Sequence, residues 1–261
     1  MYEKIKISII TVCYNAVKEI GKTISSVKKQ TYDNIEYLIK DGNSSDGTYE
    51  LLCELNQDSK FKIIRGEDRG IYDAMNIAVG NVTGDYIFFL NAGDIFVNNR
   101  VVEKFVEFAI CHKDADIIFG NVIRLDKEGK KHYRTYPAIC SKKIYFLSGD
   151  CICHQVIFAK RESLIKRPFL LDFKVCADRE WMLALIQTKK CFAHMDLWIS
   201  QCEEEGYSTR NQMIYEREVK HCIDKYFNKI EYMFYIVICY IKQNRMMCDI
   251  LKKMGIIFFS K

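Results

Sequence analysis

The fold of this chain is decided by Gly84 to Asp94, GDYIFFLNAGD, in which an apolar run leads directly into a carboxylate on a short polar turn. A run this short, bounded by polar and glycine residues, is typical of a strand covered on both faces, as in a parallel sheet beneath helices. Ligands of such sheets bind beyond the carboxyl ends of the strands, so we expect Asp94 at a site of chemistry. A carboxylate in that place can hold Mg²⁺ or Mn²⁺.

The residues before this strand alternate between strand and helix patterns. Short β-branched and apolar runs that stop at polar turns predict strands, and apolar residues at helical spacing predict helices. The predicted strands cover residues 6–12, 35–39 and 61–64, and the predicted helices cover residues 17–30, 49–55 and 70–79. Strands and helices that alternate in this way predict an α/β fold with an open, doubly wound, mostly parallel sheet.

Four motifs stand in this part of the chain in a specific order and spacing. They are Cys13-Tyr14-Asn15 after the first strand, KDGNSSDGT at residues 40–48, GIYDAMN at residues 70–76 and TGDYIFFLNAGD at residues 83–94. Together they resemble the nucleotide-sugar-binding half of a family 2 glycosyltransferase with the GT-A fold. The resemblance is strong over the first third of the chain and looser over the middle third, and it implies a nucleoside diphosphate sugar as donor.

The resemblance also implies a set of donor-binding residues. Asp41 stands at the family position whose carboxylate accepts a hydrogen bond from a uracil-type ring nitrogen, while Thr11 and Tyr14 flank the base and the ribose. Asp73 faces the donor from the helix before the last strand, and Asn91 follows that strand. From the residues alone, Asp41 could instead cap its own turn.

The implied metal site is reduced to one carboxylate. Members of the family carry acidic residues at several positions of the turn, but here residues 91–93 are Asn, Ala and Gly, which leaves Asp94. Mg²⁺ or Mn²⁺ can still bind, because Mg²⁺ keeps several waters and needs one or two carboxylates plus substrate phosphates. Met75 stands where the family has a basic residue, and Arg69 could take over that contact.

The resemblance implies a catalytic base in LDFKVCADREW, residues 171–181. Asp178 fits the family position at the start of a helix, where a carboxylate is held in its ionised form. It would take the proton of the acceptor hydroxyl. Two alternatives stay open: Asp178 only caps the helix, or Glu180 is the base.

The sequence CICHQ at residues 151–155 suggests zinc at first sight, but no second ligand pair stands at matching spacing. The resemblance instead implies that His154 and Gln155 lie on the acceptor side of the cleft. His154 could equally be a hydrogen-bonded interior residue.

Composition bounds the class of protein. Twelve irregularly spaced Cys do not form the framework of a small secreted protein, and no leader pattern opens the sequence, so we expect a reducing cytoplasmic location. With 49% apolar residues and two Pro, the chain can bury a large core. We expect a catalytic domain over residues 1–205, with a donor half (1–97) and an acceptor half (98–205), followed by a helical extension over residues 206–261.

The positive charge lies in this extension. Residues 1–205 hold 29 basic and 29 acidic residues, whereas residues 206–261 hold 10 and 5, so the net charge of +5 belongs to the extension. Apolar runs mixed with basic residues over 230–261 are too short to span a bilayer but suit a peripheral contact with anionic lipid. Packing on the catalytic domain or a homodimer contact is the alternative. Nucleic-acid binding is disfavoured, because no recognised module is present.

The sequence therefore predicts an inverting glycosyltransferase that moves a sugar from a nucleoside diphosphate donor, a UDP sugar in particular, to a hydroxyl of a glycan or lipid-linked glycan. The expected setting is the inner face of the cytoplasmic membrane. A catalytically silent nucleotide-sugar binder or membrane assembly partner of the same fold is the alternative. A nucleotidyltransferase would need a basic, Gly-rich triphosphate loop near the N-terminus, and the sequence has none.

Overall fold

The protein is described by a computed structural model that covers residues 4–148, 150–204, 206–234 and 237. The strands are β1 Ile7–Cys13, β2 Ile35–Asp41, β3 Lys62–Arg65, β4 Tyr86–Phe89, β5 Ile95–Phe96, β6 Ile117–Leu125, β7 Lys131–Arg134, β8 Ile157–Lys160 and β9 Phe192–Glu203. The α-helices are α1 Ile20–Lys28, α2 Thr48–Leu55, α3 Ile71–Val79, α4 Val101–Cys111, α5 Arg161–Lys166, α6 Ala177–Gln187, α7 Tyr207–Arg210 and α8 Gln212–Tyr226. Short 3₁₀ turns are η1 Ala138–Ser141, η2 Lys143–Ser148 and η3 His154–Val156.

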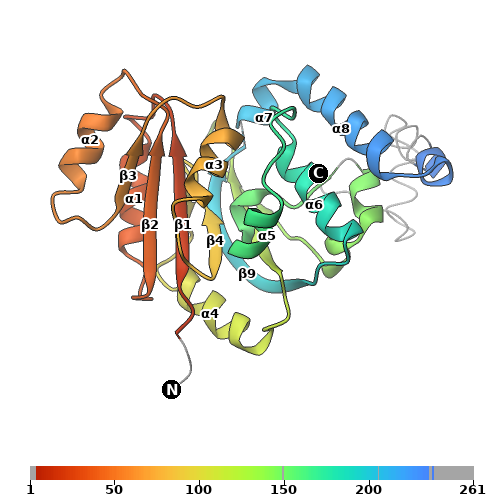
Figure 1. Cartoon of the computed structure of the whole chain (residues 1–261), viewed down its shortest axis with the longest axis horizontal. Coiled ribbons are helices and arrows are strands. Elements are labelled where there is room, and N and C mark those ends of the chain that lie inside the picture. The colour runs from red at the N-terminus through yellow and green to blue at the C-terminus, as the bar shows by residue number, and fades with distance from the viewer. Residues whose placement is uncertain (1–3, 149, 205, 235–236, 238–261) are drawn as a thin grey trace.

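The first half of the sheet has the predicted parallel arrangement. The strand order is β3-β2-β1-β4, and every neighbouring pair is parallel. The chain moves outward from β1 to β2 and β3, and then returns to place β4 on the other side of β1, as Figure 1 shows. Such a reversal is a topological switch point, where a crevice opens beyond the carboxyl ends of the strands.

The second half of the sheet is mixed. Beyond β4 the order continues β8-β6-β9-β5, with β7 paired to β6. Strand β8 is antiparallel to β4 and β6, whereas β9 runs parallel to β6 along a long ladder. Parallel ladders hold most of the paired residues, so the predicted α/β fold with a mostly parallel sheet is confirmed. One continuous sheet joins the predicted donor and acceptor halves, and the boundaries at residues 97 and 205 stay a prediction.

The Thr-Gly-Asp motif at residues 83–85 brings β4 against the start of β1. The Gly84 N–H donates to Ser8 Oγ at 2.9 Å, and Asp85 Oδ2 accepts from the Lys6 N–H at 2.7 Å. A Cβ added to Gly84 would lie 2.6 Å from the Ser8 backbone nitrogen. Only glycine therefore allows this approach, which aligns β4 so that Asp94 emerges beside the end of β1.

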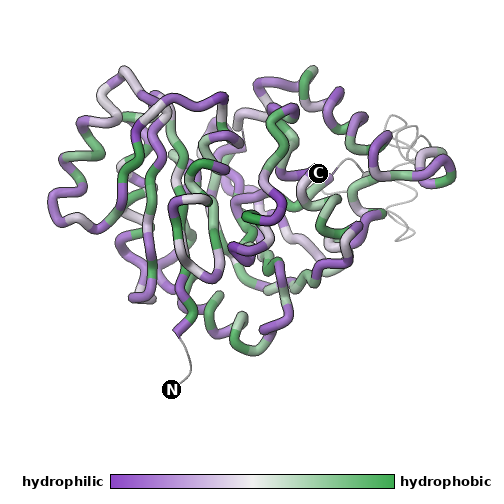
Figure 2. The backbone as a smooth tube through the Cα atoms, in the orientation of Figure 1, coloured by the Kyte–Doolittle hydropathy of each residue, from purple (hydrophilic) through white to green (hydrophobic). Residues whose placement is uncertain are grey.

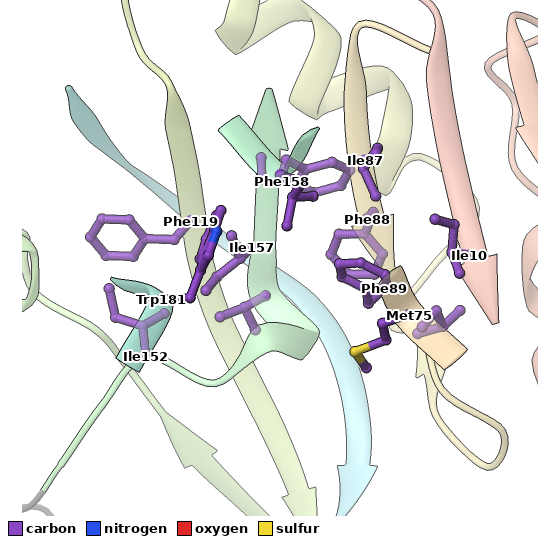
Figure 3. Close-up of a cluster of buried hydrophobic side chains, with 14 of the residues drawn as sticks. Ile10, Met75, Ile87, Phe88, Phe89, Phe119, Ile152, Ile157, Phe158 and Trp181 are labelled. Atoms are coloured by element: carbon purple, nitrogen blue, oxygen red, sulfur yellow. The ribbon is translucent and has the colours of Figure 1, made fainter. Parts of the chain in front are cut away.

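The core lies on both faces of the central strands. Figure 3 shows Phe88 of β4 beside Phe158 of β8, and their ring centroids are 4.4 Å apart. Phe158 also stacks on Phe105 of α4 at 3.8 Å. The central strands carry long hydrophobic stretches in Figure 2, whereas α8 alternates hydrophobic and hydrophilic residues. Burial on both faces explains why the strand residues read as unbroken apolar runs.

The extension begins as a packed part of the domain, because α8 lies against α6. Residues 235–236 and 238–261, which hold most of the predicted membrane-contacting segment, lie outside the described residues. Within the described part, no helix has the length and hydropathy needed to cross a bilayer. The ten cysteines in that part are all free.

Candidate active site

A cleft of about 1210 Å³ opens at the switch point of the sheet. Its walls come from the residues that follow β1, from the turn after β4, from the segment before β8 and from the start of α6. Six of the predicted site residues line it: Tyr14, Asn91, Asp94, His154, Gln155 and Asp178. Asp94 and Asp178, 84 positions apart in sequence, therefore share one cavity.

A chain of hydrogen bonds joins the two sides of this cleft. His154 Nδ1 lies 3.0 Å from Asp178 Oδ2, and His154 Nε2 lies 2.9 Å from Asn91 Nδ2. Because the amide of Asn91 donates to Nε2, the ring proton stands on Nδ1 and is donated to the carboxylate. His154 thus fixes the orientation of the Asp178 carboxylate relative to the turn that carries Asp94.

The Asp178 carboxylate is held in its ionised form. Burial on its own would raise the pKa of Asp178, but hydrogen bonds from His154, the Arg179 N–H and Tyr72 outweigh burial, so the pKa lies below its ordinary value. The Tyr72 hydroxyl is 3.1 Å from Asp178 Oδ1. Burial and the negative charge of Asp178 raise the pKa of Tyr72 well above its ordinary value, so this hydroxyl keeps the proton that it donates.

The pKa of Asp94, in contrast, lies above its ordinary value. Burial raises the pKa of the Asp94 carboxyl to about 7, although the nearby His154 ring and a hydrogen bond from Gln155 lower it in part. Its side chain is almost fully buried, and its backbone carbonyl accepts from Thr23 Oγ1 at 2.8 Å. A buried carboxylate with so little compensation is a group that a cation would stabilise.

The donor atoms at this turn fit a hard divalent cation. Beside Asp94, the Asn91 Oδ1 atom is buried and has no hydrogen-bond partner within the described part of the chain. Carboxylate and amide oxygens are the ligands that Mg²⁺ and Mn²⁺ take, together with water and phosphate. In the described ranges, no three His, Cys, Asp or Glu side chains form a metal-binding group. The oxygens of Asp94 and Asn91 therefore fit a cation that binds together with the phosphates of the substrate.

Three predicted donor-binding residues stand behind the cleft wall. Thr11 and Asp41 are fully buried, and Thr11 Oγ1 donates to the Leu90 carbonyl at 2.7 Å. Asp41 accepts from the Ser44 N–H at 3.1 Å. Asp73 Oδ2 accepts from the Arg69 N–H at 2.9 Å. These contacts shape the wall, and the roles of the three residues toward a donor stay predictions.

Met75, which stands where the family has a basic residue, and Arg69, the proposed substitute, both have other contacts. Met75 is fully buried and lies beside Phe89 in Figure 3. Arg69 is exposed and pairs with Asp73. Neither side chain lines the cleft.

Glu180, the alternative catalytic base, is fully buried away from the cleft. Its Oε1 accepts from Arg167 Nη2 at 2.6 Å, Lys225 Nζ at 2.7 Å and the Tyr226 hydroxyl at 2.5 Å. These contacts tie α8 to α6, so the geometry favours a structural role for Glu180 and leaves Asp178 as the carboxylate that faces the cleft.

We expect Glu180→Gln to lower the free energy of unfolding by about 2 kcal/mol, because two cations lose their buried partner but still reach solvent. Urea denaturation measures this. Glu162→Gln removes an exposed pair with Lys166 and should leave the urea midpoint of unfolding unchanged. The structural assignment is wrong if Glu180→Gln abolishes turnover while the protein remains as stable as the parent.

The segment that precedes Asp178 is held by a second acid on α8. Glu218 is buried, and its carboxylate accepts from the N–H groups of Lys174 at 2.6 Å, Val175 at 2.9 Å and Cys176 at 2.8 Å. Three such bonds fix the backbone immediately before α6 begins at Ala177. The extension thereby sets the position of Asp178.

Sequence reasoning missed several further charged residues of the cleft, among them Arg124, Arg134 and Asp150. Arg134 Nη2 pairs with Asp150 Oδ1 at 2.8 Å. Arg124 and Arg134 lie on the paired strands β6 and β7, which have no motif to single them out. Tyr72 was also missed as a partner of Asp178, although the GIYDAMN motif contains it.

Known sequences agree with this architecture. Residues 8–164 match the family model described as Glycosyl transferase family 2. A PGL/p-HBAD biosynthesis glycosyltransferase of Mycobacterium bovis (strain BCG / Pasteur 1173P2) is 28% identical over 190 residues, which cover 72% of this chain and 70% of the relative. Glycosyltransferase GlyG of Streptococcus pneumoniae serotype 4 is 28% identical over 130 residues, which cover 49% of this chain and 42% of GlyG.

Solved structures share the fold at low identity. S. aureus TarS 1-349 in complex with UDP-GlcNAc has a TM-score of 0.64 at 17% identity, over 86% of this chain and 68% of that chain. Of the longer TarS chain, the match spans 40%. The mannosyltransferase PcManGT from Pyrobaculum calidifontis, in complex with GDP-Man and Mn²⁺, has a TM-score of 0.58 at 15% identity, over 80% of this chain and 60% of that chain.

Proposed function

The chain belongs to glycosyltransferase family 2 and transfers a sugar from a nucleotide sugar, and from this premise we propose an inverting, metal-assisted transfer to a hydroxyl group in which Asp178 is the base. The observation that carries the proposal is that Asp178 and Asp94 face one cleft at the switch point of the sheet. One carboxylate is ionised and oriented, and the other is buried and favours a cation.

In the proposed reaction, the acceptor hydroxyl oxygen bonds to the anomeric carbon while the bond from that carbon to the diphosphate oxygen breaks. The hydroxyl proton passes to the Asp178 carboxylate, and the nucleoside diphosphate leaves with the bonding electrons. Attack from the face opposite the diphosphate inverts the anomeric centre. His154 and Tyr72 support the proposal, because their hydrogen bonds hold Asp178 in a single orientation.

Asp94 would hold Mg²⁺ or Mn²⁺, with Asn91 Oδ1 as a second oxygen of the turn. When bound, the ion would neutralise the charge that builds on the departing diphosphate. A structural relative whose complex contains GDP-Man and Mn²⁺ supports this part of the proposal. Tyr14, which is exposed and lines the cleft, would contact the base or ribose from the end of β1.

The acceptor is proposed to be a glycan or a lipid-linked glycan of the cell surface, modified at the cytoplasmic face of the membrane. The M. bovis relative, which is named for PGL/p-HBAD biosynthesis, supports this acceptor class, and the TarS complex with UDP-GlcNAc supports a nucleotide-sugar donor.

A panel of nucleotide sugars in a thermal-shift assay with Mn²⁺ tests the proposal. The true donor should raise the melting temperature, because a ligand that binds only the folded state stabilises it according to its affinity. UDP should raise it more than GDP if Asp41 has its proposed base-reading role. A silent binder would show the shift but would release no sugar from the donor, and a protein that no nucleotide stabilises would contradict the proposal.

The raised pKa of Asp94 predicts a pH dependence for cation binding. Because the carboxyl has a pKa of about 7, a proton competes with the cation below that pH. Affinity for Mn²⁺ in the absence of nucleotide should fall roughly tenfold for each pH unit below about 7 and level off above about pH 8. Calorimetric titration over this range measures it, and Asp94→Asn should bind weakly at every pH. An affinity that does not change across neutral pH would contradict the assignment.

A further inference from the structure

Two arginines form a positively charged corner of the cleft beyond the predicted donor residues. Arg134 on β7 pairs with Val122 on β6, two residues from Arg124. Arg124 and Arg134 are therefore diagonal neighbours on one face of the β6–β7 ladder. Backbone positions related in this way are roughly 7–8 Å apart across the two strands. Both line the cleft.

Three arginines and the carboxylate of Asp150 meet at this corner, while Glu203, which is paired with Lys22, and Glu204 line the cleft at the end of the neighbouring strand β9. Arg134 pairs with Asp150, and the fully buried Arg179 donates to the Asp150 carbonyl at 3.2 Å. Arg124 has no hydrogen bond or ion pair with any residue that the structure describes, and its Nε atom is buried. A guanidinium held partly out of water without a counter-ion is costly, and such a cost is found where a ligand supplies the missing charge.

The position of the corner separates it from the predicted donor residues. Those residues lie in or just after β1, β2 and β4 and on α3, whereas Arg124 is the penultimate residue of β6, three strand steps from β1 in the order β1-β4-β8-β6. At the spacing of neighbouring strands this is about 14 Å. Asp94 follows β4 and His154, which is bonded to Asp178, precedes β8, and both strands lie between β1 and β6. We therefore place the corner on the acceptor side of the cleft.

We propose that Arg124 and Arg134 form a subsite for an anionic group of the acceptor, a phosphate or a carboxylate. The planar fork of a guanidinium matches the paired oxygens of either group, which makes arginine suited to this contact. The inference rests on the proposed function, since it assigns a charge to the acceptor of the same reaction.

The test titrates inorganic phosphate into the full chain saturated with UDP and Mg²⁺, so that the donor's own phosphate positions are filled. We expect the parent protein to bind phosphate under these conditions. Arg124→Gln should weaken phosphate binding at least tenfold and leave the affinity for UDP within twofold. Lys131→Gln, on the same hairpin but exposed, is the matched control and should change neither affinity.

A second variant separates a binding role from a structural one. Without any ligand, Arg124→Met should raise the melting temperature by about 2–4 °C, because it removes an uncompensated charge and keeps the volume of the side chain. A fall in melting temperature would show that Arg124 supports the fold and would overturn the proposal.

The remaining outcomes are equally decisive. Loss of phosphate binding by the parent protein once UDP is bound would mean that the arginines serve the donor diphosphate, and the proposal would be wrong. If UDP does not bind the parent at all, the proposed donor function fails. In that case, phosphate is titrated into the parent and the Arg124→Gln protein without nucleotide. Equal phosphate affinities of the two proteins would then overturn the subsite.

Discussion

Asp178→Asn is expected to lower the rate of sugar transfer by about 10³-fold, within the range that general-base catalysis contributes. The amide cannot take the proton of the acceptor hydroxyl. Its NH₂ group would also meet the donating Nδ1 of His154, so the ring would lose its fixed orientation. The affinity for the nucleotide should stay nearly unchanged, because the carboxylate acts on the acceptor.

Steady-state kinetics with donor and acceptor, together with a nucleotide-binding measurement, check this result. Asp172→Asn is a matched control, because Asp172 is exposed in the same segment and does not line the cleft. It should keep turnover within about twofold of the parent. A tenfold or smaller loss in Asp178→Asn would remove Asp178 from the chemical step and leave it as a helix-terminal residue only.

Asp94→Asn should lower metal-dependent turnover by about 10²-fold or more, the usual cost of removing a group that stabilises developing charge. The turn has one carboxylate, so no other acid of the turn can compensate. The folded protein should be no less stable, since the substitution replaces a buried carboxyl by a neutral group of nearly the same volume.

A Mn²⁺ titration of turnover measures the effect. Glu203 supplies the sharpest comparison, because it lines the cleft and its negative charge contributes to the raised pKa of Asp94. Glu203 is paired with Lys22 and is more exposed, so Glu203→Gln should change turnover by no more than about threefold. Equal losses in the two variants would mean that the cation is held by both acids.

Much of the fold followed from local pattern. The strands β1, β2 and β4 are buried on both faces, so their apolar runs and the turns that end them are visible in the sequence. The antiparallel strands were harder to predict, because β8 has only four residues and β7 is largely exposed. Their pairing depends on contacts between distant segments, which no local pattern encodes.

The site was predictable in its parts but not in its connections. Asp94 and Asp178 could be chosen because each follows a recognisable motif. The link between them through His154 and Asn91 depends on how η3 approaches β4, and that approach is a property of the assembled sheet. Arg124 was not visible for the same reason: an arginine on a strand reads as a solvated charge until its surroundings are known.

The three backbone N–H groups that donate to Glu218 indicate how much of the chain is needed for activity. A shortened protein that stops after residue 205 would keep every predicted site residue, yet it would leave the backbone ahead of α6 without its acceptor. The same truncation would also remove Lys225 and Tyr226, which donate hydrogen bonds to Glu180. We therefore expect the smallest active unit to extend at least through Tyr226, because α8 holds the segment that positions Asp178.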